Sequence, residues 1–173
     1  MMSRTLAGAA LLLAAAAAIA GSPRTEPRFI DAVDLARVIV DGDSVRVLDL
    51  REAAEYERLH VPGALNVAFD DVAAAAPPFL TVLYGDDAPR AWRELERTGH
   101  REGFVLRGGM HAWLTEVMEP RLAVDATPAE TAAFEEAAEL SRFFGGTPRT
   151  GVPRAELAPA EEDVADAVIR RGC

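Results

Sequence analysis

Lysine is absent from this chain of 173 residues, so every basic side chain apart from the three histidines is an arginine. Lysine is the residue that forms Schiff bases with carbonyl substrates, and it is also the residue that reaches the nucleotide phosphates in a P-loop. The absence of lysine therefore excludes both of these enzyme classes.

Cysteine occurs once, as the final residue, Cys173. A single cysteine rules out an intramolecular disulfide, and it also rules out a metal site built on several cysteine ligands within one chain. The three histidines are scattered along the sequence and do not form a metal-binding motif. We therefore expect no metal and no cofactor, and a fold that depends on its hydrophobic core.

Positive charge is also scarce, because 18 arginines stand against 28 acidic residues and the formal net charge is -10. An acidic protein is repelled by the phosphates of nucleic acids and by anionic membrane surfaces, so neither is an expected partner. Half of the residues are hydrophobic and 27% are charged. This length and composition are typical of one globular domain with additional segments.

The first twenty residues have the pattern of a secretory signal peptide. Arg4 supplies a basic start, residues 6–20 are uncharged and rich in leucine and alanine, and Ala18-Ile19-Ala20 is a small-x-small cleavage site. The alternative is an uncleaved anchor formed by residues 5–20, although a spanning helix needs about 20 strongly apolar residues. We predict an exported protein, periplasmic or extracellular, that contacts a membrane only if this leader stays uncleaved.

Beyond the leader, strand-like apolar runs alternate with segments of helical spacing. The strands are expected at residues 28–30, 45–50, 79–84 and 104–106. Helices are expected after the N-cap Asp31, after Glu52, over residues 69–75, from Pro89 and from Gly108-Gly109, with a turn over residues 59–66. Strands and helices that alternate at short intervals predict an α/β fold, a small parallel-type sheet with helices on both faces.

The composition changes beyond Pro120. Thr127-Pro128-Ala129-Glu130 is a capping box that predicts a helix ending near Phe144, followed by a loop over residues 147–159. A final amphipathic helix is expected to place three apolar side chains on one face: Val164, Ala167 and Val168. We expect the C-terminal helices to pack onto the preceding domain through Phe134, Leu140, Phe143 and Phe144; docking of a partner is the alternative.

Four sequence matches resemble the rhodanese-like family over residues 29–120. They are Val47-Leu48-Asp49-Leu50-Arg51, Glu55-Tyr56, the turn His60-Val61-Pro62-Gly63-Ala64-Leu65-Asn66, and Leu106-Arg107-Gly108-Gly109-Met110-His111-Ala112-Trp113. Each match alone is weak, but together they are specific. The resemblance implies a rhodanese-like domain at residues 29–120, between the leader at residues 1–20 and a helical C-terminal extension at residues 121–173.

The resemblance also implies where the catalytic loop lies, and this loop departs from the family pattern of cysteine-x-x-glycine-x-arginine-serine. Here the six positions are Gly85, Asp86, Asp87, Ala88, Pro89 and Arg90. The loop length and the arginine are kept, but the nucleophilic cysteine is replaced by Gly85. Such a loop stabilises a thiolate with backbone N–H groups and a helix N-terminus, and Asp86 and Asp87 would repel an anionic substrate there.

The remaining residues of the candidate site have mostly structural interpretations. Asp87 is expected to be the N-cap of the helix led by Pro89, with a remnant ligand site around Arg90 as the alternative. We expect Asp49 and Arg51 to hold the loop that leaves the sheet. Structural roles are expected for His60 and His111, and core packing for Trp92 and Trp113.

The sequence leads to one main functional hypothesis and two rivals. The main hypothesis is an exported, inactive rhodanese-like module that binds or scaffolds a protein partner in the cell envelope. The first rival is a sulfurtransferase or thiol-redox protein that uses Cys173 as a displaced thiol. The second rival is a loop that binds a small ligand without turnover. Cys173 is otherwise an inert thiol or the site of an intermolecular disulfide.

Overall fold

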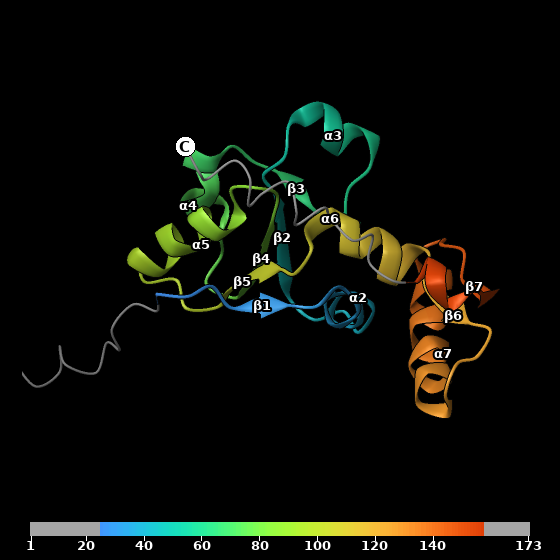
Figure 1. Ribbon diagram of the computed structural model, residues 1–173. Coiled ribbons are helices and arrows are strands. Elements are labelled where there is room, and N and C mark those ends of the chain that lie inside the picture. The colour runs from blue at the N-terminus through green and yellow to red at the C-terminus, as the bar shows by residue number, and fades with distance from the viewer. Residues whose placement is uncertain (1–24, 158–173) are drawn as a thin grey trace, which may run out of the picture.

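A five-stranded parallel sheet forms the centre of the protein in the computed structural model, which describes residues 25–157 (Figure 1). The strands lie in the order β1-β5-β4-β2-β3, and every neighbouring pair is parallel. Their bounds are β1 (Phe29–Ile30), β2 (Val45–Asp49), β3 (Leu65–Asn66), β4 (Leu80–Tyr84) and β5 (Gly103–Leu106). This arrangement confirms the predicted parallel α/β fold.

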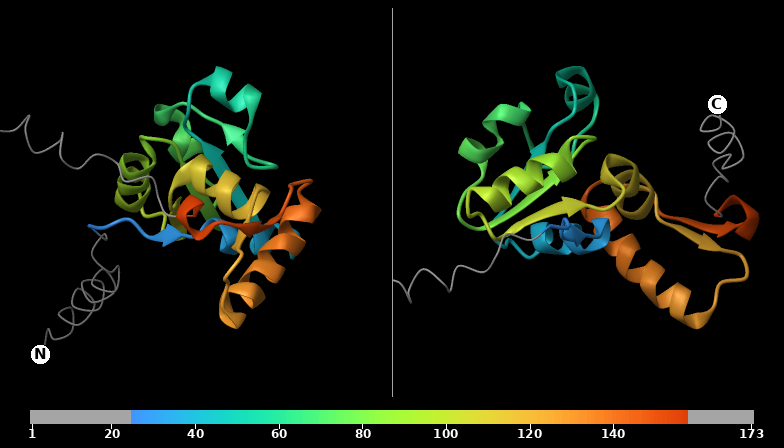
Figure 2. Two further views of the ribbon diagram at one scale, coloured as in Figure 1. Left: turned by 45° about the vertical axis from the view of Figure 1, so that its right-hand side comes forward. Right: turned by 60° about the vertical axis from the view of Figure 1, so that its left-hand side comes forward.

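Helices cover both faces of the sheet (Figures 1 and 2). One face carries α2 (Ala32–Val40), α6 (Gly109–Ala112) and the π-helix η3 (Trp113–Met118); the other carries α4 (Val72–Ala75) and α5 (Ala88–Arg97). Successive side chains of a strand point to opposite faces, so Val47 and Val82 enter the first hydrophobic cluster while Leu48 and Leu83 enter the second. The sequence predicted one helix after Gly108-Gly109. The structure has the short α-helix α6 there, which continues directly as the π-helix η3.

The connection between β2 and β4 begins at the carboxyl edge of the sheet. It contains α3 (Ala53–Arg58), which buries no residue, the short strand β3, and a 3-10 turn, η2 (Phe69–Asp71), ahead of α4. The prediction of a simple turn over residues 59–66 was incomplete, because Leu65 and Asn66 pair with Leu48 and Asp49 of β2. A two-residue edge strand has too few residues to show the alternation by which strands are predicted.

Asp31 precedes α2 as predicted, but it does not cap the helix through its side chain. Its carboxylate instead accepts a hydrogen bond of 2.7 Å from Nε of Arg107, which follows β5. This ion pair joins the loops after two neighbouring strands, β1 and β5.

The C-terminal extension contains β6 (Arg121–Ala123), α7 (Pro128–Phe143), β7 (Arg149–Val152) and the 3-10 turn η4 (Arg154–Glu156). The capping box at Thr127 and Glu130 is confirmed. The prediction of a loop over residues 147–159 was wrong, because β7 pairs in parallel with β6 to form a second, two-stranded sheet. Its irregular register and the left-handed Gly151 hide the strand pattern in the sequence.

The extension packs onto the domain as expected for two of its four apolar residues. Leu140 belongs to the first hydrophobic cluster, and the ring of Phe144 meets that of Trp113 edge-on at 5.1 Å. Phe143 is 65% exposed. Phe134 is half-buried.

The end of α7 is held to the end of η3 by the carbonyl oxygen of Met118. This oxygen accepts hydrogen bonds from Oγ of the buried Ser141, at 3.0 Å, and from the backbone N–H of Thr147, at 2.7 Å. Gly146 lies between them and donates its backbone N–H to the carbonyl oxygen of Ser141. The extension therefore continues the domain core and is not a detached tail.

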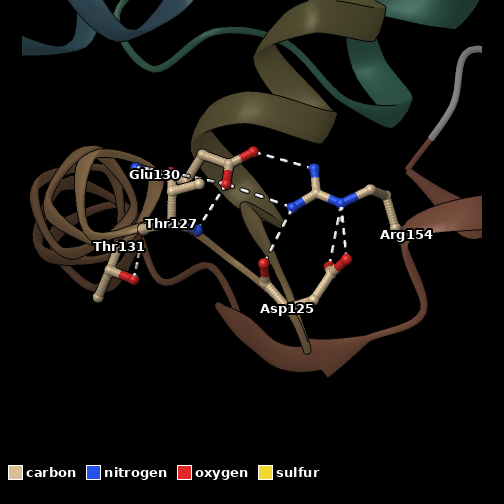
Figure 3. Close-up of polar contacts among 5 residues, drawn as sticks. All are labelled: Asp125, Thr127, Glu130, Thr131 and Arg154. Atoms are coloured by element: carbon tan, nitrogen blue, oxygen red, sulfur yellow. Dashed lines mark hydrogen bonds and ion pairs between the residues drawn. The ribbon is translucent and has the colours of Figure 1, made fainter.

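Arg154 connects the far end of the extension to the start of α7 (Figure 3). Its Nε is 3.0 Å from a carboxylate oxygen of Asp125, and its Nη1 is 3.0 Å from a carboxylate oxygen of Glu130. The second oxygen of Glu130 accepts hydrogen bonds from the backbone N–H and the hydroxyl of Thr127. The partners Arg154 and Thr127 lower the pKa of Glu130 to about 2.

A change at Arg154 is expected to raise the pKa of Glu130. A lowered carboxyl pKa stabilises the fold above the unfolded value of 4.5, and this contribution disappears as the pH falls from 4.5 toward about 2. In Arg154→Gln, an NMR titration should therefore place the Glu130 carboxyl closer to 4.5. The Arg142→Gln variant, which removes the same charge from α7 without touching this network, should leave the low pKa in place. Equal titration of Glu130 in both variants would contradict the assignment.

No helix among residues 25–157 is long and apolar enough to cross a membrane. The predicted leader at residues 1–20 and the predicted final helix around Val164, Ala167 and Val168 lie outside the described residues.

Candidate functional site: a degenerate loop at the carboxyl edge of the sheet

The candidate loop follows β4, a central strand with β2 and β5 on either side. Ligand sites of open parallel sheets lie beyond the carboxyl ends of such strands. Tyr84 ends β4 and is fully buried, and its carbonyl oxygen accepts a hydrogen bond of 2.9 Å from the backbone N–H of Leu50. The chain therefore enters Gly85 from a firmly held strand end.

The backbone N–H groups in the second half of the loop are used within the protein. The N–H of Ala88 bonds to the carbonyl oxygen of Gly85 at 3.0 Å, and the N–H groups of Arg90 and Ala91 both bond to the carbonyl oxygen of Asp87. Pro89 has no N–H to offer. Because α5 already begins at the buried Ala88, half of the six loop positions lie in its first turn and have no N–H left for an anion.

Gly85 has a backbone conformation that disfavours any side chain. Its φ angle is +112°, a region that residues other than glycine rarely adopt. A Cβ atom built on Gly85 would lie 3.2 Å from the carbonyl carbon of Leu50 and 3.3 Å from the backbone nitrogen of Arg51. The position that the resemblance assigns to the nucleophile therefore has no sulfur, and a side chain there would be strained and tightly packed against Leu50 and Arg51.

Asp87 occupies the N-cap position of α5, but its side chain makes no capping hydrogen bond, so that prediction was wrong in its chemistry. Capping requires an extended backbone at this position, whereas Asp87 has helical angles, φ -82° and ψ -3°. Its carboxylate lies 3.8 Å from the guanidinium of Arg90. Arg90 itself is 68% exposed and stacks on the ring of Phe69 at 4.1 Å, so its charge faces η2 and Asp87.

An open hollow of about 440 Å³ lies beside the loop. Apolar residues from β1, β5 and α6 form one wall, among them Phe29, Val105 and Met110, and a smaller polar hollow of about 210 Å³ adjoins the charged wall. The two hollows share Arg51, Glu55 and Asp86 and also expose Glu52 and Asp87. Four carboxylates therefore surround one arginine, an arrangement that repels thiosulfate and other anions.

Arg51, which lines this hollow, forms an ion pair with a buried aspartate. Asp49 is fully buried, and its carboxylate accepts hydrogen bonds from Nε and Nη2 of Arg51, at 3.0 and 2.6 Å, and from the Arg51 backbone N–H. The same guanidinium donates to the carbonyl oxygen of Leu59 at 2.7 Å. The prediction that Asp49 and Arg51 hold the loop leaving the sheet is confirmed.

Tyr84 completes this network, and the sequence analysis missed its role. Its hydroxyl accepts a hydrogen bond from the backbone N–H of Val61 at 3.2 Å. Burial and the hydrogen bond to Asp49 raise the pKa of Tyr84 above its ordinary value. A tyrosine at the end of a strand predicted to be buried was the signal available, because a buried hydroxyl needs a partner.

The structure shows the surroundings of the two histidines and two tryptophans that the sequence singled out. His60 stacks on Tyr56 at 4.1 Å and its Nδ1 lies 2.9 Å from the Tyr56 carbonyl oxygen, which confirms a structural role. His111 is exposed on α6 at the rim of the hollow. Trp92 and Trp113 are buried as predicted, and Trp92 donates its Nε1–H to the carbonyl oxygen of Gly103 at 2.9 Å.

Two further predictions concern metals and the terminal thiol. Among residues 25–157, the His, Asp and Glu side chains form no group of three or more that could hold a metal ion. Cys173 lies outside the described residues.

A small parallel sheet covered on both faces by helices, with a loop and a helix after its central strand, defines a domain of the parallel α/β class. The family model of the rhodanese-like domain matches residues 31–116. Residues 31–116 are a rhodanese-like domain.

Solved structures similar to this chain include other rhodanese-like proteins. The Alr3790 protein from Anabaena is 26% identical over 49% of this chain and 74% of its own, with a TM-score of 0.44. A rhodanese-like domain protein from Staphylococcus aureus is 20% identical over 50% and 90%, with a TM-score of 0.41. The single-domain sulfurtransferase RDL2 of Saccharomyces cerevisiae is 14% identical over 53% and 92%, with a TM-score of 0.44. No curated protein matches the chain.

Proposed function

We propose that this protein is an exported rhodanese-like module that has no sulfurtransferase activity and serves as a binding or scaffolding domain in the cell envelope. One observation carries the proposal: the position of the nucleophile is occupied by Gly85, at a φ angle of +112° that disfavours a side chain. Sulfur transfer by such a loop needs a thiolate that becomes a persulfide. None of the six loop residues has a sulfur or hydroxyl nucleophile.

The surroundings of the loop support the same conclusion. The N–H groups of Ala88 and Arg90 are used within the first turn of α5 and are not available to an anion. Glu52, Glu55 and Asp86 place negative charge where thiosulfate would bind. The larger hollow keeps an apolar wall, which is suited to binding, whereas the loop lacks the nucleophile that sulfur transfer requires.

The test is a thiosulfate-to-cyanide sulfur-transfer assay on the mature protein, beside Cys173→Ser and an active rhodanese as positive control. We expect no transfer above background in either form of this protein. Activity in the parent that disappears in Cys173→Ser would overturn the proposal and would make the terminal thiol catalytic, which is the rival hypothesis.

Restoring the cysteine alone is expected not to restore activity. The Gly85→Cys variant should show no transfer above background, because its backbone is strained and the carboxylates around the loop repel thiosulfate. Gly85→Ala is the matched control without sulfur, and both variants should lose about 1–3 kcal/mol of unfolding free energy in urea titrations. Rhodanese-level activity in Gly85→Cys would show that the loop still forms a cradle and had lost only its nucleophile.

Export is tested separately, by the intact mass of protein recovered from the culture of an expressing bacterium. Cleavage after Ala20 gives a mature chain that begins at Gly21. Recovery of only the uncleaved chain in the membrane fraction would instead support an anchor at residues 5–20.

A further inference from the structure

A second hollow, of about 360 Å³, lies away from the degenerate loop, between the rhodanese-like domain and the C-terminal extension. The domain contributes α2 and η3 to its walls, and the extension contributes β6 and α7. Its lining is mostly apolar and includes Val33, Leu122, Ala133, Phe134, Ala137 and Leu157, with Glu116, Arg121 and Glu130 as its charged residues. We call this hollow the α7 groove.

The α7 groove is open because the N-terminal half of α7 is less closely packed than its C-terminal half. Ala137 and Leu140, on the C-terminal half of the helix, are buried, whereas Ala133 is exposed and Phe134 only half-buried. Figure 2 shows this N-terminal half of α7 projecting beyond the sheet and its covering helices. Covering the part of Phe134 that is still exposed would remove apolar surface from water, so the groove favours an apolar occupant.

The C-terminal segment of the chain itself is the occupant nearest to the α7 groove. Leu157, the last described residue, itself lines the α7 groove, and 16 residues follow it. Their sequence has apolar side chains at helical spacing, Val164, Ala167 and Val168, with acidic residues at 161–163 and 166. The seven residues from Leu157 to Val164 span at most about 25 Å when extended and about 10 Å as a helix, so the stripe is within reach of Phe134.

We propose that the C-terminal segment, residues 160–171, covers the α7 groove as an amphipathic helix. Val164, Ala167 and Val168 face Val33 and Phe134, and the acidic side chains face solvent. The covalent connection at Leu157 gives this segment a millimolar effective concentration at the groove, which is the physical reason for preferring it to a separate partner. The inference does not depend on whether the degenerate loop is inactive.

Disulfide trapping tests the proposal in the full mature chain. The background is Cys173→Ser, which removes the only native thiol. The test pair is Ala133→Cys with Ala167→Cys, and the control pair is Ala132→Cys with Ala167→Cys. Ala132 is the exposed neighbour of Ala133 and does not line the groove, so the two pairs differ only in the direction of the α7 side chain.

In a glutathione redox buffer, non-reducing mass spectrometry should show the intrachain disulfide of the 133–167 pair forming at least about tenfold faster than that of the 132–167 pair. Adding Val164→Asp and Val168→Asp should remove this difference. Equal rates for the two pairs would overturn the proposal, and so would a disulfide that forms only between chains, because the groove would then be covered by a second copy. Disulfide trapping does not depend on sulfur transfer, and the sulfur-transfer assay does not depend on the α7 groove. Either the proposed function or the proposed cover of the groove can therefore be wrong without affecting the other.

Discussion

Asp49→Ala is expected to lower the free energy of unfolding by about 3–5 kcal/mol, the usual cost of removing one partner from a buried ion pair. Asp49 is fully buried and the Arg51 side chain is only 15% exposed. Without the carboxylate, the guanidinium and the Tyr84 hydroxyl would lose their common partner in a place that water does not reach easily. Urea titration and the melting temperature both measure the loss.

A matched control separates burial from ion pairing as such. Glu94 and Arg97 also lie 2.6 Å apart, but their side chains are 42% and 70% exposed. Glu94→Ala should therefore cost about 0.2–1 kcal/mol. Similar losses in Asp49→Ala and Glu94→Ala would mean that Asp49 is not the buried centre of the network.

The same pair has a pH signature. Burial by itself would raise the pKa of Asp49, but the hydrogen bonds from Arg51 and Tyr84 outweigh it and hold this pKa below its ordinary value of 3.8. The stabilisation by Asp49 is therefore complete above pH 3.8 and is lost as the pH falls through the lower folded pKa. Stability should fall more steeply below pH 3.8 in the parent than in Asp49→Ala.

Gly146→Ala is expected to cost about 3 kcal/mol, the upper end of the range for overpacking. A Cβ atom on Gly146 would lie 2.2 Å from the Met118 carbonyl oxygen and 2.5 Å from Oγ of Ser141. Both atoms belong to the junction that joins α7 to η3, so relief of the clash must break the hydrogen bonds there. Hydrogen exchange should show faster exchange at the backbone N–H of Thr147 as well as lower overall stability.

The adjacent glycine provides the control. Gly145 has a φ angle of +78°, but a Cβ atom there would meet nothing within 4 Å. Gly145→Ala should therefore cost only the backbone strain, about 1–2 kcal/mol, and should leave the exchange of Thr147 unchanged. If Gly145→Ala were the more harmful substitution, the close contact at Gly146 would not be what holds the extension in place.

Much of the fold was predictable because local chemistry and tertiary packing agree in this chain. The apolar run of β2 and the capping box of α7 each match the element that forms. The prediction was wrong for residues 147–159, which contain β7, because a short irregular strand takes its conformation from its partner β6 and not from its own pattern.

The features of the candidate site also fall into two groups, those that the sequence determines and those that depend on the tertiary structure. The sequence by itself determined that the loop has no sulfur, that the chain is acidic and that Asp49 and Arg51 lie at the end of a central strand, since these depend on residue identity and on order along the chain. Only the tertiary structure decided the left-handed backbone of Gly85, the stacking of Arg90 on Phe69 and the hydroxyl of Tyr84 at Val61. Each of these is a contact or strain between segments distant in sequence, and no local pattern encodes which segments meet.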